Sequence, residues 1–413
     1  MITGSGRRRE RRRIPIRSRT LTALAAAMVS VVALDSCSSP ASTALPVAPA
    51  TSPVPPIPLS NSSAHPAASW ATLAMGHLDD PLNTFWQLFH LSSGSNRWVL
   101  ATPPGVASNG GLVASIAPSG SVLAGFEPTQ DLLFSPLARS TDQGATWAPS
   151  VLPGALAPVP DSLVASSDGQ ELALLRGGRG RVVDSDTGML SWKTVASERT
   201  LAADPSTSAC GIEQFTAIGL GAADLAGGTG TAGTLIIGAA CARADHSGIF
   251  EQVGDDWVPV GPALPGAHVG QTEVIRLLTT PNGTAALVRA GTGSTATLFA
   301  MWSTDGLKRW TISAGLPLAG GILTSTGTTT SGFVVAVTGA DARRSASVVS
   351  PVATGWVHLV APPAGTSAVV ATPEGFFDAL VASQSTLDVY TLGRGGWSRT
   401  QMLSVPIQYG SSG

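Results

Sequence analysis

Residues 140–147 read Ser140-Thr141-Asp142-Gln143-Gly144-Ala145-Thr146-Trp147. An aspartate in a short polar stretch accepts hydrogen bonds from the backbone N–H groups of a turn, and glycine adopts the positive φ angle that a tight turn needs. A tryptophan at the end of the stretch buries a large ring between adjoining strands. We therefore expect this stretch to close a β-hairpin, with structural roles for Ser140, Asp142, Gly144, Thr146 and Trp147.

Seven tryptophans recur at similar intervals along the chain. They are Trp98, Trp147, Trp192, Trp257, Trp310, Trp356 and Trp397, and the gaps between them are 49, 45, 65, 53, 46 and 41 residues. A period near fifty residues is about the length of one four-stranded propeller blade. The period predicts an all-β fold, a β-propeller of about seven four-stranded blades, and six or eight blades also fit the spacing.

Short apolar stretches separated by turn residues support four strands in each repeat. In the last repeat these stretches are residues 368–371, 376–381, 387–392 and 397–403, and turn residues such as Pro and Gly separate the first two. The stretch Trp70 to Ala74 is an alternative source for the outermost strand of the last blade, which would close the propeller and remove exposed sheet edges. No segment after residue 68 keeps a helical period over three turns.

The pattern S-x-D-x-G-x-T-W of residues 140–147 resembles the Asp-box, or BNR repeat, of the sialidase superfamily. Weaker copies are Ser303-Thr304-Asp305-Gly306, with a longer gap from its glycine to Trp310, and Ser185-Asp186-Thr187-Gly188 before Trp192. In that family Asp-boxes lie away from the catalytic centre and mark the fold. The resemblance therefore implies a sialidase-like propeller in which Asp142, Trp147, Asp305 and Trp310 are structural.

The first 68 residues differ in composition from the rest. An arginine-rich start precedes the apolar run Leu21 to Leu34, whose 14 residues suit a signal peptide better than a membrane span. Leu34-Asp35-Ser36-Cys37 resembles a bacterial lipobox, although Asp35 departs from the usual small or apolar residue. We expect a lipoprotein signal peptide over 1–36, lipid attachment at Cys37, a disordered Pro/Ser/Ala-rich linker over 37–68 and the propeller over 69–413.

These segments imply an address outside the cytoplasm. We expect the domain to be held at the extracytoplasmic face of the cell membrane through its N-terminal acyl anchor. The alternative is ordinary signal peptidase cleavage near Ser42-Thr43-Ala44, which would give a secreted protein.

The charge balance argues against nucleic acid as a partner. The first 36 residues hold eight arginines and two acidic residues, so 16 of the 24 basic and 24 of the 26 acidic residues remain in the exported part. An acidic domain of this kind does not bind nucleic acid or anionic lipid through a basic patch. We expect a monomer whose other partner is an envelope glycan or protein.

Cys210 and Cys241 remain as an even pair in an oxidising compartment once Cys37 is lipidated. A disulfide between them would stabilise the fold by roughly 3 kcal/mol in the chain-entropy model. It would clamp the longest interval of the tryptophan repeat. The alternative is two buried free thiols.

Catalytic groups do not assemble into a known pattern. Sialidases use three arginines, a Tyr–Glu pair and an acid/base Asp, but the Arg-Ile-Pro match at Arg13-Ile14-Pro15 lies in the leader. The two tyrosines are Tyr390, at the end of an apolar stretch, and Tyr409, in the C-terminal tail. The six histidines are scattered without ligand spacing. The sequence predicts no catalytic residue, no metal site and no cofactor.

The sequence is compatible with three functions. The first is a non-catalytic binding or scaffold module for an envelope glycan, lipid or protein, because propeller function usually lies in loops and the fold alone does not name it. The second is a divergent sialidase-like glycoside hydrolase or lyase, which requires two carboxylates close together on one face of the central funnel. The third is an assembly or stability factor for a membrane complex.

Overall fold

The computed structural model describes residues 60–80, 83–103, 111–117, 120–127, 137–150, 160–165, 171–175, 180–185, 191–221, 234–243, 245–266, 270–280, 283–352 and 355–407. All of them belong to one compact unit, Val54–Gly413. Cys37, the signal peptide, Asp186 and Gly188 lie outside the described residues.

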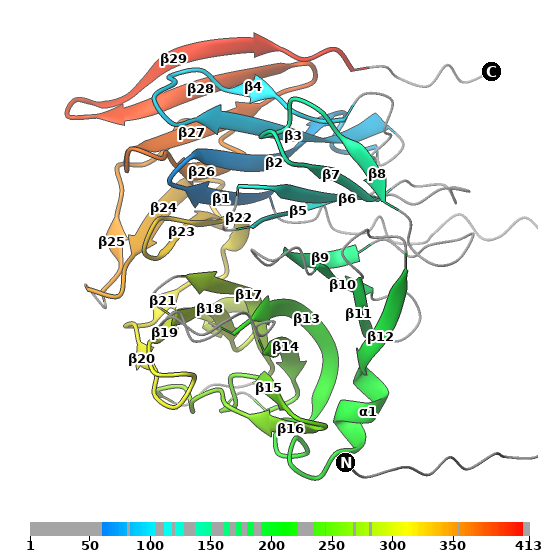
Figure 1. Ribbon diagram of the computed structural model, residues 1–413. Coiled ribbons are helices and arrows are strands. Elements are labelled where there is room, and N and C mark those ends of the chain that lie inside the picture. Colours follow the sequence, from blue (N-terminus) through cyan, green and yellow to red (C-terminus); the bar gives the residue numbers. More distant parts are fainter. Residues whose placement is uncertain are drawn as a thin grey trace, which may run out of the picture. The chain divides into compact units, whose positions relative to one another are not determined.

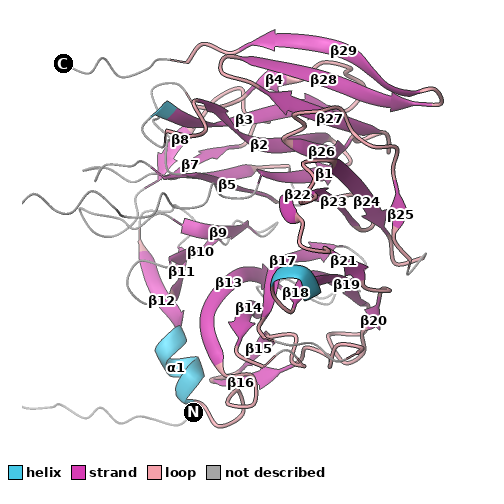
Figure 2. Cartoon of the chain, turned by 180° about the vertical axis from the view of Figure 1, so that it is seen from behind, coloured by secondary structure: helices cyan, strands magenta, loops and turns pink. Residues whose placement is uncertain are grey.

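The described strands include seven groups of four consecutive strands, and neighbouring strands within each group pair antiparallel (Figures 1 and 2). The first three groups are β1 (Ser60–His65), β2 (Ala68–Gly76), β3 (Thr84–Ser92), β4 (Val99–Leu100); β5 (Gly111–Ile116), β6 (Val122–Glu127), β7 (Leu137–Ser140), β8 (Ala148–Ser150); and β9 (Pro160–Ala165), β10 (Glu171–Leu175), β11 (Arg181–Ser185), β12 (Trp192–Ser197).

The other four groups are β13 (Ile212–Leu220), β14 (Leu235–Cys241), β15 (Ile249–Val253), β16 (Asp256–Pro259); β17 (Thr272–Thr280), β18 (Gly283–Ala290), β19 (Thr297–Ser303), β20 (Thr311–Ile312); β22 (Ile322–Thr328), β23 (Phe333–Thr338), β24 (Arg344–Val349), β25 (Val357–His358); and β26 (Ala368–Ala371), β27 (Phe377–Ala382), β28 (Thr386–Gly393), β29 (Gly396–Ser404). A short extra strand, β21 (Leu316–Pro317), pairs with β19. The described residues also include the helix α1 (Glu198–Ala203) and the 3-10 turn η2 (Gly293–Thr295). The fold is a β-propeller, and its described strands fall into seven blades.

The propeller begins earlier than the sequence predicts. Strand β1 lies within the segment expected to be a linker, and it pairs with β2 along five residues. The alternation of small and polar residues in Ser60–His65 carries too little apolar signal to be recognised as a strand. Residues 60–68 are therefore part of the first blade rather than of the linker.

The seven recurring tryptophans, called the tryptophan ladder below, lie in or directly before the outermost strand of each blade. In the fifth, sixth and seventh blades the tryptophan also ties that strand to the blade before it. The indole N–H groups of Trp310, Trp356 and Trp397 donate to carbonyl oxygens of the preceding blade. The acceptors are Val260 at 2.7 Å, Ala314 at 2.9 Å and Val360 at 2.9 Å, in that order. Each acceptor lies three or four residues after the previous tryptophan of the ladder. The period of the ladder therefore reflects contacts between blades as well as the hairpin within each blade.

The Asp-box at residues 140–147 forms the turn between β7 and β8. The Asp142 carboxylate accepts from the Thr146 backbone N–H at 2.8 Å and from the Thr146 hydroxyl at 2.5 Å, while the Ser140 hydroxyl accepts from the Gly144 N–H at 2.7 Å. These donors stabilise the ionised carboxylate and lower the pKa of Asp142 to about 2, with the Thr146 hydroxyl as the largest cause. The turn is therefore held by its own side chains.

The copy at residues 303–310 has the same backbone geometry despite its shifted glycine. Asp305 accepts from the Arg309 N–H at 2.9 Å, four residues on, as Asp142 does. In both turns the two residues after the aspartate have positive φ angles, Gln143 and Gly144 in one and Gly306 and Leu307 in the other. The shifted glycine therefore changes which residue bears the strained φ angle, and the turn itself stays the same.

We expect Gly144→Ala to lower the free energy of unfolding more than Gly306→Ala. Both positions have positive φ, at 84° and 69°, which costs about 1 to 2 kcal/mol for alanine. A Cβ at Gly144 would also lie 3.0 Å from the Trp70 ring, whereas one at Gly306 meets nothing within 4 Å. Overpacking adds about 1 to 3 kcal/mol. Urea unfolding of both variants measures the difference, and equal losses would contradict the contact between Gly144 and Trp70.

The first and last blades meet without sharing a strand. Trp70 to Ala74 lies in β2, the second strand of the first blade, and the last blade takes all four strands from its own segment. The alternative in which Trp70 to Ala74 closes the last blade is therefore wrong. Strand β1, in the segment predicted to be a linker, is the innermost strand of the first blade, so β2 becomes its second strand.

Side chains make the junction between these two blades. Trp98 is 1% exposed, and its indole N–H donates to the Asp378 carboxylate at 2.9 Å. The Gln401 side chain bonds both the N–H and the carbonyl of Trp98, each at 2.8 Å. The Glu374 carboxylate accepts from the Gly94 N–H at 2.7 Å. Apolar residues of the two blades pack into one buried cluster beneath these bonds, which includes Leu73, Phe89, Val370, Leu380 and Val389.

Candidate functional site

Arg276 lies on the inner strand β17 and reaches the inner strands of two other blades. Its guanidinium Nη1 donates to the carbonyl oxygens of Ser62 at 3.1 Å and Thr326 at 3.0 Å. These acceptors lie on β1 and β22, which pair in parallel. Although the residue is only partly buried as a whole, desolvation of the guanidinium lowers the pKa of Arg276 to about 10, so it stays charged at neutral pH.

The small cavity beside Arg276 does not fit a substrate. Its volume is about 10 Å³, which is room for one water at most. Hydroxyl-bearing and apolar residues line it: Ser62, Ser63, Thr72, Ala114 and Ile116 among others. No carboxylate is among the described residues that line this cavity, so the described side chains around Arg276 do not provide the acid pair that the hydrolase hypothesis places at the funnel.

A larger cleft lies between the fourth and fifth blades. Its volume is about 260 Å³, and it lies where the inner strands β13 and β17 begin, on the opposite face from the Asp-box turns. The end of β14 pairs with the start of β17 there, which joins the two blades into one sheet. The lining residues are mainly polar: Glu213, Gln214, Ala240, Gln271, Glu273, Arg289, Gly291 and Thr292.

The floor of this cleft is a row of four residues in register across four strands. Gln214 on β13 is opposite Ala240 on β14, Ala240 is opposite Glu273 on β17, and Glu273 is opposite Arg289 on β18. Directly opposite residues on antiparallel strands share a face of the sheet. The small side chain of Ala240 lies between longer polar side chains, and this size difference makes the hollow.

Glu213 enters the cleft through an irregularity in β13. The pairing of β13 with β14 shifts between Ile212 and Gln214, so Glu213 has no residue opposite it. An extra residue of this kind forms a β-bulge, which re-aims a side chain. Glu213 accepts a hydrogen bond from the Gln271 side-chain amide, and Glu273 forms an ion pair with Arg289. Both carboxylates of the cleft are therefore engaged with protein donors.

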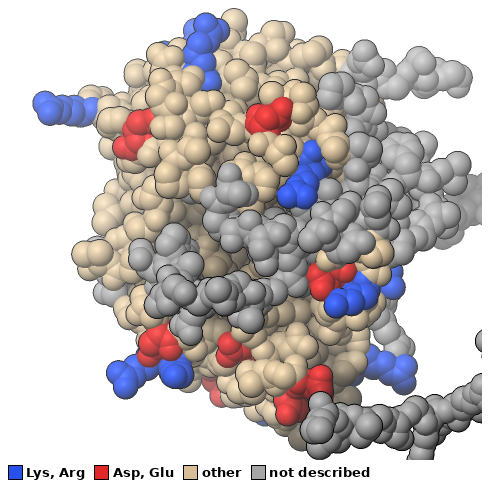
Figure 3. Space-filling model, in the orientation of Figure 1, with Lys and Arg blue, Asp and Glu red and all other residues tan. Residues whose placement is uncertain are grey.

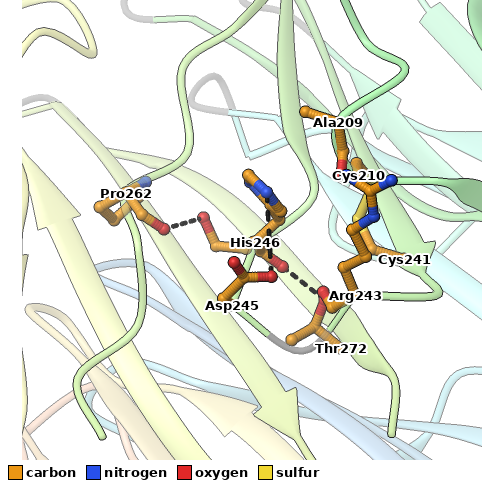
Figure 4. Close-up of polar contacts among 9 residues, drawn as sticks. Ala209, Cys210, Cys241, Arg243, Asp245, His246, Pro262 and Thr272 are labelled. Atoms are coloured by element: carbon orange, nitrogen blue, oxygen red, sulfur yellow. Dashed lines mark hydrogen bonds and ion pairs between the residues drawn. A yellow bond between two sulfur atoms is a disulfide. The ribbon is translucent and has the colours of Figure 1, made fainter. Parts of the chain in front are cut away.

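A disulfide and a set of polar contacts hold the rim of the cleft (Figure 4). Cys210 and Cys241 are bonded, and Cys241 is the neighbour of Ala240. Arg243 Nη1 donates to the Ala209 carbonyl at 2.9 Å, and the Thr272 hydroxyl donates to the His246 carbonyl. These contacts join the chain before β13, the end of β14 and the start of β17. They therefore hold together the chain segments next to the lining residues Glu213, Ala240 and Gln271.

The lining residues were not identified from the sequence. They come from four segments up to 79 residues apart, and their proximity depends on the register between blades. One signal was present: the inner strands of two successive repeats begin with acidic and amide residues, Ile212-Glu213-Gln214 and Gln271-Thr272-Glu273, before they become apolar. The predicted site residues Ser140, Asp142, Thr146, Asp305 and Trp310 lie on the opposite face, in the hairpin turns.

The face drawn in Figure 3 is mostly neutral, with acidic and basic side chains scattered over it and no continuous basic patch among its described residues. Within the described part of the chain no three His, Cys, Asp or Glu side chains gather as a metal site would require. None of the described helices has the length and apolar character that a membrane span requires.

The comparisons with known proteins support the fold of this chain but identify no family for it. No protein-family model and no curated protein matches this chain. A candidate 6-phosphogluconolactonase from Bacteroides uniformis is similar in structure, with TM-score 0.51 and 14% identity over 83% of this chain and 97% of that chain. The GH74 enzyme of Niastella koreensis has TM-score 0.51 and 10% identity, over 83% of this chain and 58% of that chain.

The β-propeller domain of the Trilobed protease from Pyrococcus furiosus is a third similar structure. It covers 83% of this chain and 97% of its own, with TM-score 0.45 and 7% identity. At 14% and 10% identity, the two structures with TM-score 0.51 support a likeness of fold alone.

Proposed function

We propose that this chain is an extracytoplasmic β-propeller lipoprotein that binds a component of the cell envelope without catalysis. The observation that carries the proposal is the row Gln214, Ala240, Glu273 and Arg289, which crosses four strands and two blades. Side chains on strands are held more rigidly than side chains on loops, so the cleft is organised before a ligand arrives. Its carboxylates, Glu213 and Glu273, accept from Gln271 and Arg289. Such fixed pairs of donor and acceptor suit hydrogen bonding to a ligand.

The lipobox at Leu34 to Cys37 supports the membrane anchor. Metabolic labelling with an alkyne-bearing fatty acid tests it. We expect the full-length chain to be labelled and to sediment with membranes, and the Cys37→Ser variant to be unlabelled and released. Labelling of the Cys37→Ser variant would remove the anchor from the proposal.

Binding is tested with the full-length Cys37→Ser chain, which lacks the proposed acyl group. We expect it to co-sediment with insoluble envelope material from the producing cell, and Ala240→Phe, which fills the cleft, to reduce the bound fraction at least about tenfold. Arg309→Met is the matched control, because the Arg309 side chain is 92% exposed and lies outside the cleft. Equal sedimentation of all three proteins would contradict binding through this cleft.

A glycoside hydrolase is the second candidate, and one observation favours it: Glu213 and Glu273 both line the cleft. A pair of carboxylates flanking a glycosidic bond is the usual requirement for its hydrolysis. Release of reducing ends from a polysaccharide, lost in both Glu213→Gln and Glu273→Gln, would establish this activity and replace the binding proposal. We expect no release.

A further inference from the structure

We infer that the cleft between the fourth and fifth blades takes a neutral saccharide and holds it by a pair of adjacent hydroxyl groups. This inference rests on the proposed binding function and names its ligand class. The argument depends on the chemistry of the lining, on its charge and on its size.

The lining offers donors and acceptors side by side. The Glu273 carboxylate contributes only acceptors and the Arg289 guanidinium only donors, and the two side chains are in contact across β17 and β18. A sugar hydroxyl both donates and accepts. One hydroxyl of a vicinal diol can therefore donate to Glu273 while its neighbour accepts from Arg289. Glu213 and Gln271 repeat this combination of acceptor and donor at the bulge.

The charge of the lining argues against an anionic ligand. Two carboxylates and one guanidinium leave a net charge of minus one among the lining residues. A phosphate or a carboxylate-bearing sugar would meet Glu213, whose partner is a neutral amide. A neutral ligand avoids this repulsion.

The size and composition of the lining limit the ligand further. A volume of about 260 Å³ is just below the range of ≈ 300–1,000 Å³ typical of small-molecule sites, so one or two sugar rings fill it. No aromatic or large apolar side chain is among the described residues that line the cleft, which argues against a lipid tail or an aromatic ligand. Hydrogen bonds therefore carry recognition.

Native affinity electrophoresis of the full-length Cys37→Ser chain tests the inference. The gels contain dextran, mannan or galactan as neutral polysaccharides, or alginate as an anionic one. We expect at least one neutral polymer to retard the protein, and alginate not to. Arg289→Met should weaken the retardation at least about tenfold, since each hydrogen bond to a charged group contributes a factor of this order. Ala240→Phe should weaken it at least about as much, because the larger side chain fills the cleft. Arg309→Met should behave like the parent protein.

Two variants are used because a bulky residue at Ala240 can disturb the sheet, and thermal unfolding of both identifies such a disturbance. Retardation by alginate alone would overturn the inference. Retardation that Arg289→Met and Ala240→Phe leave unchanged would place binding elsewhere and would also overturn it. If none of the three neutral polymers retards the protein while it still co-sediments with the envelope through the cleft, the saccharide inference fails and the proposed function stands.

Discussion

Trp98→Ala is expected to lower the free energy of unfolding by about 3 to 5 kcal/mol, the usual cost of deleting a large buried aromatic side chain. Trp98 is 1% exposed and packs where the first and last blades meet. Its removal would leave a cavity and would also take the indole donor from Asp378, which is 4% exposed. Equilibrium unfolding in urea measures the loss. A loss below about 1 kcal/mol, typical of a surface site, would contradict the role of Trp98 at this junction.

The Trp98→Phe variant keeps an aromatic ring at this position but removes the hydrogen bond to Asp378, so it separates the two contributions. The carboxyl of Asp378 has a raised pKa, chiefly because burial disfavours its charge, and the Trp98 donor counteracts this rise. A raised pKa in the folded state adds stability at low pH that is lost as the pH rises through that pKa. Without the donor the pKa rises further. We therefore expect Trp98→Phe to be more destabilising at pH 7 than at pH 4, and a pH-independent difference would show that the bond contributes little.

Removing the disulfide with Cys210→Ala and Cys241→Ala together is expected to cost about 3 to 4 kcal/mol, because the two residues are 31 positions apart and the bond restricts the unfolded chain. The double variant avoids a free thiol at either position. Both cysteines are buried, at 4% and 0% exposure, so the native protein should resist a mild reductant while the unfolded chain does not. Urea unfolding with and without reductant measures the effect.

The same double variant tests the link between the disulfide and the cleft. Cys241 is opposite both Ile212 and Thr272, the neighbours of Glu213 and Glu273. Loss of the bond should therefore weaken binding to the envelope material. A variant that is destabilised as expected but binds like the parent protein would show that the disulfide stabilises the blade without shaping the cleft.

The sequence predicts the later blades more accurately than the earlier ones. Residues 368–371 coincide with β26, and the next three apolar stretches match β27, β28 and β29 within one residue at each end. Gly and Pro separate the first two of these strands. In the first blade, by contrast, Ser60–His65 carries little apolar signal, so β1 falls in the segment predicted to be a linker.

The candidate site could not be predicted in the same way because it depends on pairing between repeats. The described pairing of β14 with β17 joins Ala240 with Glu273 and Cys241 with Thr272. So short a pairing produces no periodic pattern in the sequence. The bulge at Glu213 is equally hidden, since it depends on which residue lacks an opposite partner. Arg276 illustrates the same limit: a charged residue inside an apolar strand is visible in the sequence, but its acceptors on β1 and β22 are not.

The junction of the first and last blades also has a consequence for how the chain matures. Its hydrogen bonds join residues about 280 to 303 positions apart, so this contact has the highest sequence separation of any between neighbouring blades. As the chain emerges in order, each new blade can dock on the one before it, but the apolar face around Leu73 and Phe89 stays uncovered until residues 368–405 are present. Contacts of such separation form slowly and leave apolar surface exposed to aggregation meanwhile. We expect a chain truncated before the last blade to keep this apolar face exposed and to depend on chaperones.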